Sequence, residues 1–471
     1  MKKTKIIATV SEMYDEKKLL WIAQAGANII RLNFSHASHE GAAKTIAMIK
    51  KLNAQGKTNL SILLDTKWPE IRTGDVKDKI QIKQGDQIKL FVKKNLVKAD
   101  KDLFCDYPYL VGDVKKGQII IIDSGLLKTE VLSKSKEYVT VKALNDHLVG
   151  SRRHVNLPGV KLRLPGLTQK DKEDILFGIN HGIDFIAASF IRNKENLLEI
   201  RSFLKKYHAE HINIISKIEN QEAIENLEEI VKHSDAIMVA RWDLWVELPI
   251  HELPYYQKAI MDMCFMYGKT IIIATELLKS MVNNKFPTRA EISDVYNSVI
   301  LRTDCLMLSE ETAIGNYPIE SVQMMTDVIQ EAEQHTNNKH KDFFVQETNE
   351  ITKEKKLIVK HALQIADETK AKYVILFTHS WTLATIAQNY KPNIPVFAFS
   401  TNERVLRTMN ILFGISPVKL SKRGTNHRVD KDQALLTLNK QWITKKWDKV
   451  IIIGDTRING EIEPHIKIIH C

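Results

Sequence analysis

The chain has 471 residues, too many for one compact core, so two or three domains are expected. With 44% hydrophobic and 27% charged residues the composition is globular, and no apolar run approaches the length that spans a bilayer. The net charge of +11 arises from 68 basic residues interleaved with 57 acidic ones. Because no basic stripe punctuated by aromatic residues appears, we expect a mixed surface suited to anionic metabolites and no nucleic-acid or membrane partner.

The N-terminus and the cysteines favour a cytoplasmic protein. The first apolar stretch, within MKKTKIIATVSE, is only about five residues long, too short for the apolar region of a signal peptide. Cys105, Cys264, Cys305 and Cys471 are scattered without metal-ligand spacing, as expected of reduced thiols.

Eight short, nearly all-apolar runs alternate with longer amphipathic segments. Such runs are typical of parallel strands covered on both faces, and segments such as Lys17–Ala25, Glu195–Lys206 and Leu253–Tyr267 have helical spacing. Strands alternating with helices in this number predict a TIM (βα)8 barrel, an α/β fold. The predicted strands are Ile6–Val10, Ile29–Phe34, Leu60–Thr66, Phe185–Phe190, Ile212–Lys217, Ala236–Ala240, Thr270–Thr275 and Cys305–Ser309.

Two further domains are expected beside the barrel. Between the third and fourth strands, alternating segments joined by Gly and Asp turns predict a small antiparallel β domain inserted in a barrel loop. The polar stretch EAEQHTNNKHKD looks like a linker, and the strand-like runs after it predict an open α/β domain. We therefore expect a barrel from 1–74 and 157–335, an inserted β lid from 75–156 and a C-terminal α/β domain from 336–471.

Polar residues follow the predicted barrel strands directly, where TIM barrels carry their functional groups. Strand ends are also polar because loops meet water, but a lysine and two carboxylates after buried strands favour a catalytic site. The residues at these ends are Arg31, Asn33, Ser35, Asp65, Thr66, Lys67, Ser216, Lys217, Glu219, Arg241, Asp243, Thr275 and Ser309.

A series of motifs covers essentially the whole chain. In order these are RLNFSHASHE, LLDTKWPEIRTG, VNLPG, IISKIENQEAIENL, MVARWDLWVELP, ATELLKSM, PTRAEISDVYN and MLSEETAIGNYP. With NERV and the pattern of the C-terminal domain, the series resembles the successive signatures of bacterial pyruvate kinases. The resemblance implies a glycolytic phosphotransferase that moves the phosphoryl group of phosphoenolpyruvate to ADP, giving pyruvate and ATP, and that forms a homotetramer.

The resemblance also implies a metal and substrate site. Glu219 and Asp243 would bind Mg²⁺ or Mn²⁺, since hard carboxylate oxygens suit a hard cation. Lys217 would neutralise charge on the phosphoryl group during transfer. Thr275 would hold the substrate carboxylate, with the backbone N–H groups of Trp242 and Asp243 opening a helix toward it.

Phosphate and nucleotide contacts follow from the same resemblance. Arg31 and Arg72 would clamp phosphates, because a guanidinium makes bidentate contacts with oxyanions. Together with Asn33 and His36 they would form the nucleotide site. Ser309, with water, is a candidate for the relay that protonates the enolate.

A monovalent cation and an effector site are implied as well. The family's K⁺ site falls on Asn33, Ser35, Asp65 and Thr66. Glu70 accompanies K⁺ dependence in this family, whereas a lysine there replaces the ion, so we expect a K⁺ requirement. The loop with Thr378, Ser380 and Thr382 resembles the family's effector phosphate loop, although a plain capped helix is an equal alternative.

Six of the seven tryptophans stand where this family has glycine; the exception is Trp21. They are Trp68, Trp242, Trp245, Trp381, Trp442 and Trp447. Glycine in such loops permits positive φ and close backbone approach, so each replacement would cost about 1–3 kcal/mol in overpacking. Our hypothesis is a decoding error, because UGA is one base from the glycine codon GGA and some bacterial lineages read it as glycine.

Two alternatives remain open at this stage. One is an inactive homologue that binds metabolites, although the retained Lys217, Glu219, Asp243 and Thr275 argue against decay. The other is a different barrel enzyme of phosphoenolpyruvate or pyruvate, such as a lyase. A milder departure from the family is Leu301-Arg302 in place of Asp-Gly.

Overall fold

The computed structural model of the protein describes residues 2–67, 69–97, 99–336, 350–421, 427–440, 443, 447–458 and 461–470. Trp68, Trp442, Cys471 and the later part of the predicted linker lie outside these residues. The first residues of that linker, from 331 to 334, are helical instead, because they complete the last turn of α12 (Pro318–Gln334).

Eight parallel strands close into a barrel in the order β1-β16-β15-β14-β13-β12-β3-β2, which confirms the predicted TIM barrel. The fourth predicted strand ends early, at Ala188, because Phe190 adopts a φ of +55° that leaves strand geometry. The strands are β1 (Lys5–Thr9), β2 (Ile29–Asn33), β3 (Ser61–Asp65), β12 (Phe185–Ala188), β13 (Asn213–Ile218), β14 (Ala236–Ala240), β15 (Thr270–Ala274) and β16 (Cys305–Leu308).

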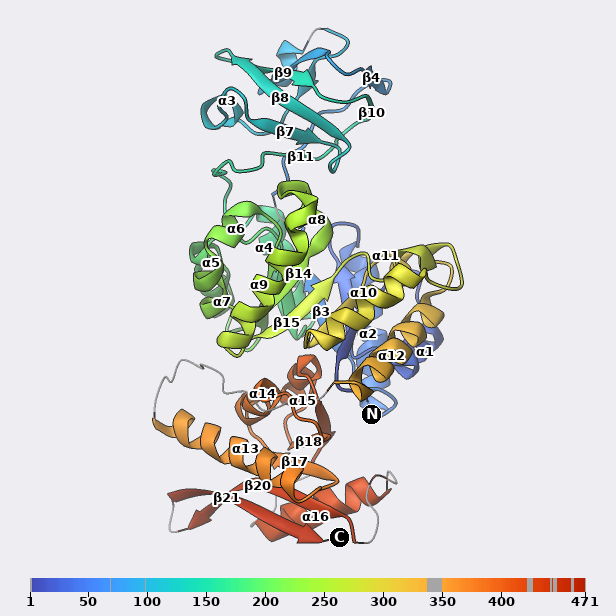
Figure 1. Cartoon of the computed structure of the whole chain (residues 1–471), viewed down its shortest axis with the longest axis vertical. Helices are drawn as coiled ribbons and strands as arrows, with labels where there is room; N and C mark the ends of the chain where they lie inside the picture. Colours follow the sequence, from blue (N-terminus) through green and yellow to red (C-terminus); the bar gives the residue numbers. More distant parts are fainter. Residues whose placement is uncertain are drawn as a thin grey trace.

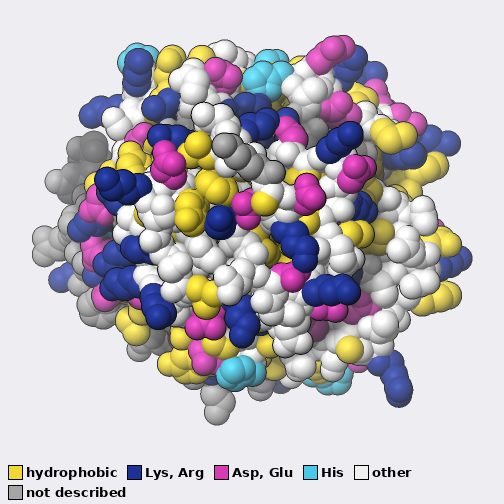
Figure 2. All heavy atoms as spheres, turned by 90° about the horizontal axis from the view of Figure 1, so that it is seen from above, with side chains coloured by type: hydrophobic (Ala, Val, Ile, Leu, Met, Phe, Trp, Pro, Cys, Tyr) yellow, Lys and Arg dark blue, Asp and Glu magenta, His cyan; other side chains and the backbone are white. Residues whose placement is uncertain are grey.

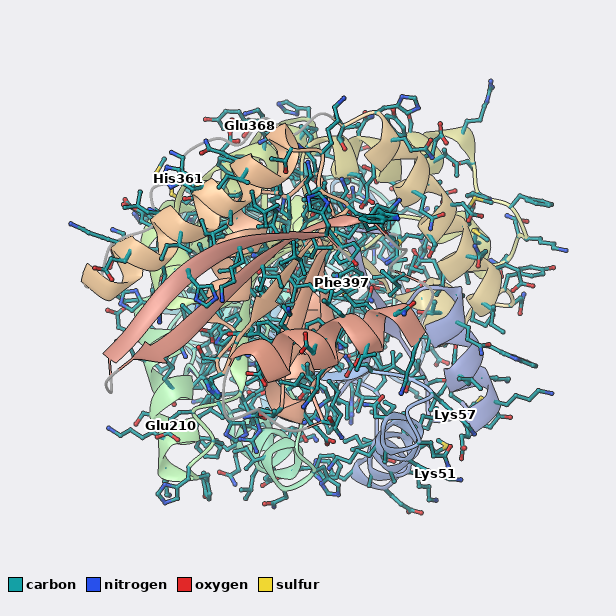
Figure 3. All side chains as sticks on the ribbon, turned by 90° about the horizontal axis from the view of Figure 1, so that it is seen from below. Lys51, Lys57, Glu210, His361, Glu368 and Phe397 are labelled. Carbon is teal, nitrogen blue, oxygen red and sulfur yellow. The ribbon has the colours of Figure 1, made fainter. Side chains whose placement is uncertain are left out.

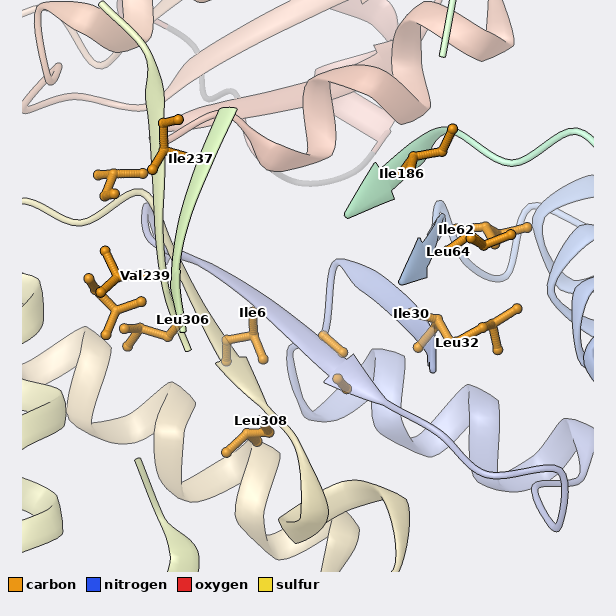
Figure 4. Close-up of a cluster of buried hydrophobic side chains, with 14 of the residues drawn as sticks. Ile6, Ile30, Leu32, Ile62, Leu64, Ile186, Ile237, Val239, Leu306 and Leu308 are labelled. Carbon is orange, nitrogen blue, oxygen red and sulfur yellow. The ribbon is translucent and has the colours of Figure 1, made fainter. Parts of the chain in front are cut away.

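Helices surround the barrel and bury the outward side chains of its strands (Figure 4). Alternate strand residues face outward because successive side chains point to opposite faces. Capping boxes at Thr168 and Thr288 fix where α4 and α10 begin. The surrounding helices are α1 (Glu16–Ala25), α2 (His39–Ala54), α4 (Gln169–Asn180), α5 (Lys194–Lys206), α7 (Leu227–His233), α9 (Leu253–Met266), α10 (Arg289–Ile300) and α12.

The inserted β domain lies at one end of the barrel (Figure 1). Its main sheet has the order β11-β7-β8-β9-β5-β6, and β10 pairs with β4 in a small second sheet. The elements are β4 (Ile80–Ile82), β5 (Gln87–Phe91), β6 (Leu103–Phe104), α3 (Leu110–Asp113), β7 (Ile119–Ile122), β8 (Leu127–Lys134), β9 (Tyr138–Ala143), β10 (His147–Val149) and β11 (Val155–Asn156).

The C-terminal α/β domain packs against the opposite end of the barrel (Figure 1). Its sheet has the order β19-β18-β17-β20-β21, with β21 antiparallel at one edge. Apolar side chains of α13 and α16 cover opposite faces of this sheet (Figure 3). The elements are α13 (Glu350–Glu368), β17 (Tyr373–Phe377), α14 (Thr382–Asn389), β18 (Val396–Ser400), α15 (Glu403–Thr408), β19 (Ile415–Lys419), α16 (His427–Lys440), β20 (Lys449–Ile458) and β21 (Glu461–His470).

Barrel and C-terminal domain share one hydrophobic cluster, which runs from the barrel interior into the core of the α/β domain. Polar contacts add to it: Gln388 donates to the Thr270 hydroxyl at 2.9 Å, and Arg407 pairs with Asp184 at 2.8 Å. The end of the barrel interior that faces the C-terminal domain is therefore filled with apolar side chains.

The face seen from the lid end carries positive and negative side chains interspersed with hydrophobic ones, as the composition predicts (Figure 2). In the part of the chain that the structure describes, no helix combines the length and apolar character that crossing a bilayer requires.

Candidate active site

A cavity of about 340 Å³ lies at the carboxyl ends of the barrel strands, under the lid. Residues from 31 to 243, far apart in sequence, converge there because parallel barrel strands all end on the same side. The sequence-predicted residues that line it are Arg31, Asn33, Ser35, His36, Asp65, Thr66, Lys67, Arg72, Lys217, Glu219, Trp242 and Asp243.

Lys217 occupies the centre of this site, at the end of β13. Its Nζ atom lies 2.8 Å from the Glu219 carboxylate, 2.8 Å from the Ser189 hydroxyl and 3.4 Å from the Asp65 carboxylate. Burial alone would lower the pKa of Lys217, but Asp65 and Glu219 outweigh burial and raise it above its usual value. The ammonium is therefore held charged in a buried place, as a group that meets a phosphoryl oxygen must be.

Asp65 links Lys217 to Arg31. The Arg31 Nε atom donates to the Asp65 carboxylate at 2.7 Å, and a second guanidinium nitrogen donates to the Thr9 hydroxyl at 2.9 Å. Although burial raises it, the pKa of Asp65 is lowered overall because Lys217 and Arg31 stabilise its charge. Asp65 stays ionised and fixes the orientation of both cations.

Glu219 and Asp243 provide two carboxylates on the same wall of the cavity, and Asp243 belongs to α8 (Arg241–Glu247). Burial and the neighbouring Glu219 raise the pKa of Asp243 to about 7. Two acids that repel each other in this way fit a cation between them. Among the described residues no three His, Cys, Asp or Glu side chains form a metal cluster.

The residues assigned to K⁺ also line the cavity. Asn33, Ser35, Asp65 and Thr66 present oxygen atoms with a single carboxylate among them. Such a shell, with one formal negative charge, suits a large monovalent cation better than a divalent one.

Arg72 lies on the lid side of the cavity and already has partners. Its Nε atom donates to Glu70 at 2.7 Å, and its guanidinium lies 2.6 Å from the His154 ring nitrogen. Another of its nitrogens donates to the Arg152 carbonyl at 2.7 Å. Arg72 must exchange some of these contacts before it can bind a phosphate in the way that the family resemblance implies.

Thr275 and Ser309 follow the neighbouring strands β15 and β16, but they do not line the cavity. The Thr275 hydroxyl accepts the Trp242 N–H at 3.0 Å, so this N–H, expected to face the substrate, is occupied. Thr275 has a φ of +69°, an uncommon conformation for a non-glycine residue that is often found at functional sites. The Ser309 N–H donates to the Glu311 carboxylate at 2.8 Å.

Six residues that line the cavity were not predicted from the sequence: Ser124, His154, Asn156, Ser189, Phe190 and Val246. The Ser189 hydroxyl bridges Lys217 and Asp65, and the Phe190 N–H donates to Glu219 at 2.6 Å. Ser189 and Phe190 are the last two residues of the predicted strand Phe185–Phe190, where the polar serine was a usable signal that the strand ends. Asn156, from the end of the lid, donates to Glu247 at 2.9 Å, a contact that no local pattern indicates.

Tryptophans enter the site from α8. Trp242 lines the cavity, and its ring centroid lies 5.4 Å from that of Trp245. Trp245 packs so closely against Gly125 of the lid that a Cβ there would lie 3.0 Å from the indole. The two indoles therefore fill space between α8 and the lid.

The predicted effector residues also lie together, in the C-terminal domain before α14. The Thr378 hydroxyl donates to the Ser380 carbonyl, and the Ser380 and Thr382 hydroxyls are 3.1 Å apart. Trp381 is the residue before this helix and packs partly against the core of the domain.

Basic side chains beside carboxylates at the mouth of a barrel are typical of enzymes that transfer phosphoryl groups. Residues 1–322 match the family described as pyruvate kinase, barrel domain, and residues 356–463 match pyruvate kinase, alpha/beta domain. The chain belongs to the pyruvate kinase family, whose members typically use Mg²⁺ and K⁺. This match over the barrel and the C-terminal domain sets aside the lyase alternative.

Pyruvate kinases of several organisms are similar to this protein over nearly its whole chain. The chain is 38% identical to a pyruvate kinase of Geobacillus stearothermophilus, over 99% of this chain and 80% of the relative. It is 37% identical to one of Clostridium acetobutylicum, over 98% of this chain and 97% of the relative. A crystal structure of a pyruvate kinase from Cryptosporidium parvum is similar with a TM-score of 0.93 at 31% identity, covering 100% of this chain and 96% of that one. Both the predicted fold and the predicted family are confirmed.

Proposed function

We propose that this chain transfers the phosphoryl group of phosphoenolpyruvate to ADP and releases pyruvate, with Mg²⁺ and K⁺, as a cytoplasmic homotetramer. The observation that carries the proposal is the buried ammonium of Lys217, held between Asp65 and Glu219 in the cavity. Because Asp65 and Glu219 already hold the ammonium in place, it can stabilise the charge of the phosphoryl group during transfer without moving first.

The charged residues of the cavity divide the reaction among them. Glu219 and Asp243 would hold Mg²⁺, which when bound neutralises charge on phosphoryl oxygens. Lys217 stabilises the equatorial oxygens during transfer, and Arg31 and Arg72 position the phosphates of the two substrates. The lid, which contributes His154 and Asn156 to the cavity wall, limits access of water.

Protonation of the enolate completes the reaction. Thr275 and Ser309 follow the two strands on the other side of Asp243, so they are our candidates for binding the substrate carboxylate and for relaying a proton through water. The domain limits of 1–74 with 157–335, 75–156 and 336–471 belong to the same proposal.

The direct test is pyruvate formation by the purified chain with phosphoenolpyruvate, ADP, Mg²⁺ and K⁺. We expect turnover that requires ADP and Mg²⁺ and increases with K⁺. Binding of both substrates without any pyruvate formation would contradict the proposal.

The tryptophans support a second candidate, a non-catalytic metabolite-binding homologue. Trp242 lines the cavity and Trp245 presses on Gly125, so both occupy volume that substrate and a closing lid would use. The distinguishing measurement is the mass of the peptide 237–248 from the protein's native source. Glycine at both positions means a decoding error and an active enzyme; tryptophan at both favours the non-catalytic candidate.

A further inference from the structure

A second cavity, of about 260 Å³, lies at the other end of the barrel, between the barrel and the C-terminal domain. The ends of α9 and α10 and the starts of β15 and β16 form its barrel side, and the end of α14 forms its C-terminal side (Figure 1). It shares no lining residue with the cavity at the barrel mouth, so the proposed reaction does not account for it.

Three cationic side chains line this cavity, and two of them are not matched by a carboxylate. Lys391 forms an ion pair with Asp304. The Lys269 ammonium instead donates to the carbonyls of Lys232 and Ser234, at 3.2 Å and 2.7 Å.

Arg302 is the second cation that is not matched by a carboxylate, because its side chain has no ion pair in the described part of the chain. Its guanidinium lies over the Phe265 ring, 5.9 Å from the ring centroid. The remaining acid of the cavity, Asp262, is 2.5 Å from Lys258. Positive charge is therefore in excess at this place.

Asn389 provides a neutral donor at the C-terminal side. Its side chain is only 8% exposed, and its oxygen accepts a long hydrogen bond from Gln388, at 3.5 Å. Its amide nitrogen donates to no described residue, although the residue lines the cavity. The amide nitrogen is a donor that takes no acceptor, so an oxygen atom of a ligand in the cavity would accept from it.

We propose that this cavity binds a compact organic anion through Lys269, Arg302 and Asn389. Phe265, Met261 and Ile300 provide apolar wall for the rest of the ligand. The volume lies just below the roughly 300–1,000 Å³ that is usual for ligand pockets, so the ligand is small. Phosphate esters and carboxylates share the required chemistry.

Such a ligand would contact two domains at once. Its affinity then depends on how barrel and C-terminal domain are arranged, and by linkage its binding favours one arrangement. This inference goes beyond the proposed function and holds whether or not the barrel mouth is catalytic.

Arg302→Gly is the informative variant, because Arg302 has a φ of +71° where glycine is favoured. The change removes the guanidinium without straining the fold, and its unfolding midpoint should equal or exceed that of the parent. Asn389→Asp is a second variant of nearly the same shape that places a negative charge against the anion. Lys205→Ala, at an exposed lysine of α5, is the matched control.

The probe is phenyl phosphate, measured by titration calorimetry on the full-length chain. Phenyl phosphate can also bind at the barrel mouth. Binding at the proposed site is therefore identified as the binding that Arg302→Gly weakens at least tenfold, while binding at the barrel mouth is unchanged. We expect Asn389→Asp to act like Arg302→Gly, and Lys205→Ala to bind like the parent.

Benzoate shows whether the cavity binds only phosphate esters or carboxylates as well. Binding of phenyl phosphate alone assigns a phosphate ester, whereas comparable binding of benzoate assigns a general anion site that also accepts carboxylates. Parent-like binding of phenyl phosphate by both Arg302→Gly and Asn389→Asp would overturn the proposal.

Discussion

The Nζ atom of Lys217 lies 2.8 Å from the Glu219 carboxylate, and this contact joins the phosphoryl-binding and metal-binding parts of the site. Lys217→Met should lower kcat by roughly 10²–10³-fold, the usual loss for one preorganised electrostatic group. It should also destabilise the fold by about 3–5 kcal/mol, because Asp65 and Glu219 lose the cation between them. Steady-state kinetics and urea unfolding measure the two effects.

The control for this prediction is Lys205→Ala, which removes an exposed lysine. Both kcat and the free energy of unfolding should stay close to the parent values in that variant, since exposed charges contribute little. A Lys217→Met protein with parent-like kcat would show that Lys217 has only a structural role.

Replacing both indoles of α8 with glycine tests whether they block the site. The ring of Trp245 meets Gly125 of the lid, and Trp242 lines the cavity, so the Trp242→Gly, Trp245→Gly double variant frees volume at both places. We expect kcat/KM to rise by at least about tenfold, because misplacement by 1 Å can cost on the order of 100-fold. Equal kcat/KM in the two proteins would mean that the indoles do not obstruct catalysis.

Trp447 allows a stability test, far from the active site, of the hypothesis that these tryptophans stand at glycine positions. It has a φ of +74° and is 73% exposed, so the left-handed conformation is strained while little surface is buried in return. Trp447→Gly should raise the free energy of unfolding by about 1 kcal/mol, which urea denaturation can resolve.

Trp21 is the matched control, since this tryptophan does not stand at a family glycine position. It lies within α1, and Lys17 sits 4.6 Å from its ring centroid. Trp21→Gly should lower the free energy of unfolding by at least about 1 kcal/mol, because glycine is unfavourable inside helices. Opposite signs for the two substitutions are the expected outcome; a loss of stability in both would contradict the strain argument at Trp447.

The barrel strands were predictable to within a few residues because each is an almost uninterrupted apolar run between amphipathic segments. Ala236–Ala240 was placed without error, whereas Phe185–Phe190 was drawn two residues too long. Phe190 is apolar and was included for that reason, but Ser189 before it is polar and the backbone has already turned at Phe190, whose N–H donates to Glu219. A hydrophobic pattern reports burial and not the φ angle at which a strand ends.

Most of the cavity residues were predictable, because strand order in a barrel places the strand ends together, although Thr275 and Ser309 were predicted and do not line the cavity. The pairings of these residues were not predictable. The sequence alone does not indicate that Arg72 would contact His154, since this contact depends on how the lid sits over the mouth. Nor does it indicate that Trp242 would donate to Thr275, since that contact depends on how α8 lies over the strand ends. Contacts between separate domains leave no periodic signal in the sequence.

Glu70 provides a test of the proposed K⁺ requirement. Its carboxylate lies beside Arg72 and His154 at the edge of the cavity. Glu70→Lys would place an ammonium where the site otherwise takes a monovalent cation, so activity should lose most of its dependence on K⁺. The measurement is initial rate against KCl at constant ionic strength, with Glu70→Gln as the control that removes charge without supplying a cation.

Glu247 makes the stability of the junction between lid and barrel depend on pH. Burial raises the pKa of Glu247 to about 7, and the hydrogen bond from Asn156 only partly offsets this. In the unfolded chain the pKa of a glutamate is about 4.3. The folded state therefore binds the proton of Glu247 more tightly than the unfolded state does. The stability that protonated Glu247 contributes is complete below about pH 4 and is lost as the pH rises through about 7.

Glu247→Gln should remove this part of the pH dependence, because the amide keeps a hydrogen-bonding group and cannot ionise. At pH 8 the variant should be more stable than the parent by about 3–4 kcal/mol, and near pH 4 the two should be alike. Urea unfolding at several pH values measures the difference. Asn156→Ala is the companion variant, because it deletes the donor that favours the charged carboxylate of Glu247. It should be less stable than the parent at pH 8, and its stability should still depend on pH. A difference between parent and Glu247→Gln that does not change from pH 4 to pH 8 would show that the glutamate ionises as freely in the folded chain as in the unfolded one.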